Sequence, residues 1–268
     1  MADSVKTNIE TYYENKEFSN SIQKNEAKVF GIGATINVDK STYKLFYEYS
    51  KTDTIKPPMK VDLKIQKLYA KYNYKLNDKW AVNLNHLNVL TDNIAPTTYG
   101  KAYGAGITYN FNKPTSVNFT QFYTDYKDFD VYQSNLNFDY IFKKDAFKLK
   151  LSALSKFIFL DNKDSNNFSK NAQNSYFTQG FKAHAHYKSY HFGAGLYFGK
   201  RAFAIMNDGF KIQHHAMEFD RTYAFGVGKT FSNLTLRVQY VYQRATELPI
   251  NNENVKINNT RLIANYRF

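Results

Sequence analysis

Apolar and polar residues alternate with a period of two along much of this chain, and this pattern limits its possible folds most strongly. Beginning at Leu68, every second residue is apolar: Leu68, Ala70, Tyr72, Tyr74 and Leu76. The same alternation recurs at residues 43–49, 136–142 and 234–242. A period of two places successive side chains on opposite faces of a β-strand. The sequence therefore predicts an all-β fold.

Two kinds of connection separate these stretches. Short ones, with the composition of hairpin turns, lie at residues 39–42, 77–79, 112–115, 143–146, 188–190 and 232–233. Longer polar ones lie at residues 91–101, 161–175, 205–218 and 247–255. Because the two kinds alternate along the chain, we expect tight turns at one end of the sheet and long loops at the other. Outer-membrane barrels show this asymmetry, with turns in the periplasm and loops outside the cell.

The number of alternating stretches predicts a barrel of about 14 strands, formed by residues 1–268 as one domain. About thirteen strands are clear after Lys24, and an even number requires one more, which Val5, Thr7 and Ile9 can supply. Without that N-terminal strand the count would be about 12. The predicted fold is a transmembrane, antiparallel, up-and-down β-barrel in the outer membrane of a Gram-negative bacterium.

Other fold classes explain the sequence less well. No apolar run reaches the roughly 18 residues that a membrane-spanning helix needs, although 43% of the residues are hydrophobic. A β-sandwich would fill its apolar face with Val, Ile and Leu. Here aromatic residues such as Trp80 and Phe111 flank the short turns instead, as in the girdle at a membrane interface. A lipocalin-type barrel would carry its apolar residues inside and needs only about eight strands.

The strongest local motif lies at the C-terminus. Thr260, Leu262, Ala264, Tyr266 and Phe268 form an apolar row that alternates with Arg261, Ile263, Asn265 and Arg267. This row resembles the β-signal of bacterial outer-membrane proteins, an amphipathic last strand with a terminal aromatic residue. The resemblance implies that the barrel-assembly machinery recognises Tyr266 and Phe268.

The first residues do not resemble a signal peptide. Met1, Ala2, Asp3 and Ser4 are not followed by the apolar segment that such peptides carry. We therefore expect a mature chain with an added initiator methionine. Cysteine is absent, which fits export through an oxidising periplasm.

Two sets of residues could suggest a cofactor, a metal or catalysis. Gly-X-Gly pairs occur at residues 31–33, 104–106, 193–195 and 226–228. A phosphate-binding loop needs a strand followed by a helix, whereas the alternation here continues through the glycines. We therefore interpret them as structural glycines that face the lumen, and we expect no cofactor.

The histidines give no strong site either. His184 and His186 share the inward face of one predicted strand, but two ligands are too few for a structural zinc site. His214 and His215 fall in a predicted loop near acidic residues, where a barrel enzyme could place catalytic groups. No G-x-S-x-G nucleophile motif is present. We expect no catalytic or metal site, and an outer-membrane barrel enzyme and an adhesin remain alternatives.

The net charge of +13 is expected to lie partly inside the barrel. The inward faces carry more cations than acids, and the predicted pore-lining residues are Lys44, Lys71, Lys148, Lys150, Lys182, His184, His186, Arg237 and Arg261. A nucleic-acid binder would need an exposed basic patch on a recognised module, so we expect no nucleic-acid partner. A cationic lumen attracts anions and repels cations. The sequence therefore predicts a channel with anion preference.

The whole chain resembles the porin-type outer-membrane channels, and most closely the small monomeric porins of the outer membrane protein G type, with about 14 strands. The resemblance implies a monomeric channel for passive diffusion of small hydrophilic solutes, surrounded by outer-membrane lipid and lipopolysaccharide. The alternative is a substrate-specific channel for acidic oligosaccharides or other anions. General trimeric porins usually have an acidic loop folded into the lumen, and we find no equivalent loop in this sequence.

Overall fold

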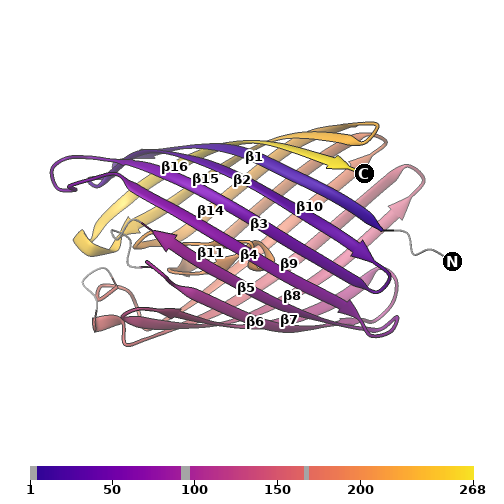
Figure 1. Ribbon diagram of the computed structural model, residues 1–268, viewed down its shortest axis with the longest axis horizontal. Helices are drawn as coiled ribbons and strands as arrows, with labels where there is room; N and C mark the ends of the chain where they lie inside the picture. Colours follow the sequence, from indigo (N-terminus) through magenta and orange to yellow (C-terminus); the bar gives the residue numbers. More distant parts are fainter. Residues whose placement is uncertain (1–4, 92–96, 166–168) are drawn as a thin grey trace.

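Antiparallel pairing closes fourteen strands into a barrel in the computed structural model, which describes residues 5–91, 97–165 and 169–268 (Figure 1). The barrel strands are β1 (Lys6–Ser19), β2 (Lys24–Val38), β3 (Ser41–Thr54), β4 (Leu63–Lys75), β5 (Trp80–Thr91), β6 (Lys101–Asn110), β7 (Thr115–Tyr126), β8 (Phe129–Lys144), β9 (Phe147–Asp161), β10 (Ser175–Tyr187), β11 (Tyr190–Arg201), β14 (Met217–Phe231), β15 (Leu234–Glu247) and β16 (Asn252–Arg267). The shorter elements are η1 (Lys163–Ser165), β12 (Ile205–Met206), η2 (Asn207–Gly209), β13 (Lys211–Ile212) and η3 (Leu248–Ile250).

The N-terminal strand closes the barrel. β1 pairs with β16 from Asn8 opposite Arg267 to Ser19 opposite Lys256, and its other edge pairs with β2. The predicted N-terminal strand is therefore confirmed, and the lower count of about 12 strands is wrong. Each of the fourteen barrel strands has at least the 10 residues of β6, which suffices for a tilted strand to cross the hydrocarbon core.

The six predicted short turns lie at the same end of the barrel as both termini, on the right in Figure 1. Several of these turns contain only two residues between the strands. The first residue of such a turn has a left-handed backbone, as at Asp39 and Asp145. Short polar residues adopt this conformation more readily than β-branched ones. At the opposite end the connections are mostly longer, although β7 and β8 are joined by Lys127 and Asp128 alone. Residues 92–96 and 166–168 of the predicted long loops lie outside the described residues.

The outer wall of the barrel is apolar. Leu68, Leu136, Val238 and Leu262 have exposed fractions of 47%, 47%, 47% and 54%, respectively. An exposed apolar belt around a whole barrel is what contact with lipid requires. The described residues contain no helix that is long and apolar enough to cross a membrane. The predicted apolar rows thus lie on the outer face, and the predicted antiparallel barrel is confirmed.

The C-terminal aromatic row also faces outward. The rings of Tyr266 and Phe268 lie 4.8 Å apart between centroids, and the backbone nitrogen of Phe268 donates to the carbonyl of Thr7 over 2.9 Å. Phe268 is 67% exposed. Recognition of these residues by the assembly machinery stays a prediction.

The connection between β11 and β14 differs from the prediction. Residues 205–218 were expected to form a polar loop outside the cell, whereas residues 202–216 fold into the barrel and carry the two-stranded sheet of β12 and β13. We call residues 202–216 the plug loop, and Figure 1 shows it in orange inside the barrel wall. The sequence did not identify this inward-folded loop, which carries a single acid, Asp208, and so differs from the acidic loop of trimeric porins.

The plug loop is held inside by apolar contacts. Its first residues, Ala202–Met206, are buried, and they belong to one cluster with inward-facing side chains of the wall. On the wall these include Ile65, Val89, Val131 and Ile158. Burial of each such side chain stabilises the packed loop by roughly 1.5–3 kcal/mol. The outer half of the lumen therefore combines this apolar cluster with buried polar and charged side chains such as Lys24, Arg201 and Glu247. The inward faces are thus not uniformly polar.

Candidate functional site

The tip of the plug loop is the turn formed by Asn207, Asp208 and Gly209. Asp208 has a left-handed backbone with φ 56° and ψ 35°, and Gly209 has φ +97°. A Cβ on Gly209 would lie 2.8 Å from Oδ1 of Asn85 in β5, so this position needs glycine for both its backbone and its close contact. The Asn-Asp-Gly sequence thus allows the chain to reverse tightly against the wall.

Polar contacts fix the plug loop to several strands. In β8, Nε2 of Gln133 donates to the carbonyl of Ile205 over 2.7 Å, and its Oε1 accepts from the nitrogen of Ile205 over 2.8 Å. In β4, Nζ of Lys71 donates to the carbonyl of Asp208 over 3.1 Å. Thr97 donates from Oγ1 to the carbonyl of His214 over 3.2 Å. These bonds satisfy backbone groups that would otherwise be buried without a partner.

Four lysines of the wall face the loop tip, and we call Lys71, Lys150, Lys156 and Lys182 the lysine cluster. All four lie within electrostatic reach of the Asp208 carboxylate. The protein atoms around Asp208 partly desolvate its carboxylate, which raises the pKa, but the four ammonium groups outweigh that effect and hold the pKa below its ordinary value. The carboxylate therefore stays ionised at neutral pH.

Members of the lysine cluster differ in their surroundings. Lys156 is 3% exposed. Lys150 forms an ion pair with Asp139, with 3.0 Å between Nζ and Oδ2, and Nζ of Lys182 lies 5.7 Å from the centroid of the Tyr197 ring. Only a small cavity of about 20 Å³ separates Asp208 from Lys71 and Lys156, which is room for about one water molecule.

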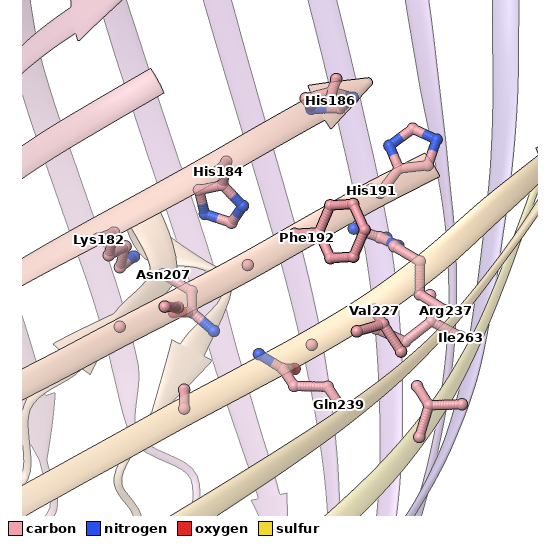
Figure 2. Close-up of a pocket in the computed structure, with 16 residues that line it drawn as sticks. Lys182, His184, His186, His191, Phe192, Asn207, Val227, Arg237, Gln239 and Ile263 are labelled. Carbon is pink, nitrogen blue, oxygen red and sulfur yellow. The ribbon is translucent and has the colours of Figure 1, made fainter. Parts of the chain in front are cut away.

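Two larger cavities lie beside Asn207. The first has a volume of about 220 Å³ and is lined by Lys182, His184, His186, His191, Arg237 and Gln239. Figure 2 shows Lys182, His184 and His186 along β10, with Asn207 of the plug loop nearby. The second cavity has a volume of about 270 Å³, and Lys44, Phe210, Lys211 and Arg261 contribute to its lining.

The predicted pore-lining residues all lie on the inner wall. Lys44, Lys182, His184, His186, Arg237 and Arg261 line the two larger cavities. Lys71 holds the loop tip, and Lys148 and Lys150 lie opposite His186 and His184 in the pairing of β9 with β10. That they border a conducting path stays a prediction.

Several inward cations are paired with acids. Arg237 donates from Nη2 to Glu10 over 2.7 Å, Arg261 bonds Glu14, and Lys67 bonds Glu48. Sequence reasoning missed Glu14 as an inward acid, although it lies in phase with Glu10 on the same strand. It also missed Lys156, which lies in phase with Lys148 and Lys150.

His214 and His215 lie inside the barrel, whereas the sequence predicted that they belong to a loop outside the cell. Burial, followed by the charge of Lys67, holds the pKa of His214 well below its ordinary value. Burial lowers the pKa of Lys211 to about 7, although Glu14 opposes that shift. Among the described residues, no group of three or more His, Asp or Glu side chains could hold a metal ion.

No family model matches the chain, and no curated protein matches it in sequence. Solved structures share its fold. A bacterial polysaccharide outer membrane secretin aligns with a TM-score of 0.58 and 8% identity, covering 100% of this chain and 99% of its own. The outer membrane protein Omp33 of Acinetobacter baumannii aligns with a TM-score of 0.57 and 10% identity over 98% and 99% of the two chains.

The NanC porin has a TM-score of 0.51 and 11% identity, covering 96% of this chain and 98% of its own. At these identities the likeness concerns the fold alone. The resemblance to small porins expected from the sequence is confirmed at that level, and the chain has the fold of the outer-membrane β-barrels.

Proposed function

We propose that the protein is an outer-membrane channel for passive diffusion of small hydrophilic solutes, with a preference for anions over cations. The observation that carries this proposal is the lysine cluster around Asp208, inside the lumen of a membrane-spanning barrel. A ring of cations in a channel attracts anions and raises the barrier for cations. Proteins named as a porin and a polysaccharide secretin share the fold, which agrees with this proposal.

The preference for anions should be modest. Arg237, Arg261 and Lys67 are each paired with an inward carboxylate, so their net contribution to the lumen potential is small. Lys156 and Lys182 form no ion pair with the acids of the described residues. The wet part of the lumen also screens charges over a Debye length of about 8 Å at physiological salt.

We further infer that the plug loop controls passage. Its apolar residues pack against the wall in the outer half of the lumen, so a solute needs this loop to shift before it can cross. Such loop motions occur in nanoseconds to milliseconds. The plug loop is therefore a gate, and its anchors at Gln133 and Lys71 are places where the gate can be loosened.

A substrate-specific channel for acidic oligosaccharides or other anions is the second candidate. The buried Lys156 favours it, because a buried ammonium group is costly unless an anion accompanies it. In either case we expect the partners to be outer-membrane lipid, lipopolysaccharide and the barrel-assembly machinery, with the protein acting as a monomer.

The test uses the full chain refolded in detergent and inserted into a planar bilayer with a tenfold gradient of KCl. We expect discrete conductance steps and a reversal potential with the sign set by chloride. A variant with residues 203–215 replaced by a short Gly-Ser linker should conduct more strongly, because the plug is gone. The proposal would be contradicted if neither the wild type nor the linker variant conducted current. A reversal potential with the sign expected for potassium would also contradict it.

A further inference from the structure

A buried lysine whose ammonium group has no ion-pair partner among the described residues lies beside the loop tip. Lys156 is 3% exposed, and its ammonium forms no hydrogen bond or ion pair with other described residues. Nearby, Arg201 is fully buried, and its Nε and Nη1 have no hydrogen-bond partner among the described residues. Buried cations are strongly unfavourable without an accompanying anion. This part of the wall is therefore built to hold a negative charge.

The acid that faces this region comes from the plug loop. Asp208 exerts an electrostatic effect on Lys71, Lys156 and Lys182. Its carboxylate does not approach any of these ammonium groups closely enough to form an ion pair within the described structure. Lys71 instead donates to the backbone carbonyl of Asp208. The carboxylate thus partly neutralises the lysine cluster without being locked to one lysine, and its side chain stays exposed to the lumen.

Neutral hydrogen-bonding groups adjoin the lysines. The small cavity between the loop tip and the wall is lined by Asn118, Thr120, Asn135 and Asn137, in addition to Lys71 and Lys156. Amides and a hydroxyl both donate to and accept from alcohol groups, whereas ammonium groups bind carboxylates. This combination suits a ligand with one carboxylate and several hydroxyl groups, the chemistry of a sugar acid.

We propose that the lysine cluster is a binding site for the carboxylate of a hydroxylated solute, and that Asp208 occupies this site as a tethered substitute while the plug loop closes the lumen. A solute carboxylate and Asp208 then compete for the same lysines. Because binding effects are reciprocal, a ligand that displaces Asp208 weakens the closed position of the plug loop, and opening of the loop strengthens binding. The inference rests on the proposed function as a channel and names its solute class.

The test measures binding without conduction, by isothermal titration calorimetry of the detergent-solubilised full chain. The probe is gluconate at constant ionic strength, and sorbitol serves as its neutral counterpart. Asp208→Asn removes the internal competitor, so we expect gluconate to bind about tenfold more tightly. Lys156→Gln should weaken binding about tenfold or more, and Asp208→Asn combined with Lys156→Gln should stay weak. Sorbitol should show no tightening with Asp208→Asn.

Glu10→Gln is the matched control, because it also removes one negative charge from the lumen but lies beside Arg237. Equal tightening by Glu10→Gln and Asp208→Asn would show a general charge effect and overturn the proposed competition. Absence of gluconate binding to both wild type and Asp208→Asn would overturn the site itself. In that case the channel would still show anion-selective conductance in KCl. The loss of gluconate binding alone therefore overturns the binding site, whereas the loss of conductance overturns the proposed channel. A heat-modifiable band on gels confirms that each variant is folded.

Discussion

Nζ of Lys71 donates a hydrogen bond to the backbone carbonyl of Asp208 over 3.1 Å, although the two residues are 137 positions apart in the chain. This bond joins the barrel wall at β4 to the tip of the plug loop. It places the loop carboxylate among the lysines of the lumen. The bond thus joins the plug loop, which we propose to be a gate, to the cationic inner wall.

Loosening the plug loop should open the channel. Gln133→Leu removes two hydrogen bonds to Ile205 and leaves its backbone groups without side-chain partners. At about 0.5–1.5 kcal/mol for each bond, the open fraction should rise about tenfold. Single-channel recording gives this fraction directly. Gln121→Leu is the control, because Gln121 bonds Ser134 on the outer face, and an equal effect of the two variants would argue against the anchor.

The two faces of the wall should respond differently to charge. Leu136→Arg places a cation against lipid, whereas Asn137→Arg places it in the lumen. The first should lower the free energy of unfolding by about 2–4 kcal/mol, and the second should have a much smaller effect. Urea titration of protein refolded into vesicles measures both. If Leu136→Arg is as stable as Asn137→Arg, the assignment of the faces is wrong.

Acid should favour release of the plug loop. The pKa of His214 in the packed loop is held well below its ordinary value by burial and Lys67, whereas a displaced loop would have the ordinary value near 6.5. As the pH falls below that value, only the displaced loop gains the proton, so the packed state loses stability.

Lys211 acts in the same direction at higher pH. Its pKa is about 7 in the packed loop because of burial, against about 10.4 when exposed. The packed state therefore becomes more stable as the pH rises from about 7 to about 10.4. Open probability should increase as the pH falls from 10 to 5, and His214→Gln should reduce the acidic part of that change. His86→Gln, in the ring contact of His86 with Tyr103, should leave the pH profile as in wild type.

Deleting Phe268 should impair assembly in cells while still allowing refolding in detergent. The exposed ring contacts Tyr266, and the backbone nitrogen supplies one hydrogen bond to Thr7, worth about 1 kcal/mol. Loss of this residue thus removes little stability. Surface labelling of whole cells measures insertion, and normal surface levels of the deletion protein would argue against a C-terminal assembly signal.

The alternation of residues was sufficient to predict the barrel, because each residue on a strand has only two possible directions. Leu136 and Asn137 follow this rule, and so does β1, which the even strand count required. The plug loop was missed because its position depends on contacts far apart in the chain. A signal was present: Ile65, Val89, Val131 and Ile158 are apolar at inward positions, and they need an apolar partner inside the barrel.

The candidate site was predicted only in part, for a related reason. Strand phase correctly directed Lys71, Lys150 and Lys182 inward, and it would also have identified Lys156 and Glu14. Phase does not reveal which cation meets which acid, because such pairs form between different strands or across the lumen. The partner that matters most, Asp208, lies in the loop that strand periodicity could not locate.

The reversal potential of the channel in a KCl gradient tests the central claim most directly. Replacing Lys150, Lys182 and Arg237 together with Gln removes three inward cations, so the reversal potential should move toward the potassium value, and the shift should be larger at low ionic strength. The control replaces three exposed lysines outside the lumen, Lys28, Lys56 and Lys256. An unchanged reversal potential in the lumen variant, or an equal shift in the control, would contradict the account.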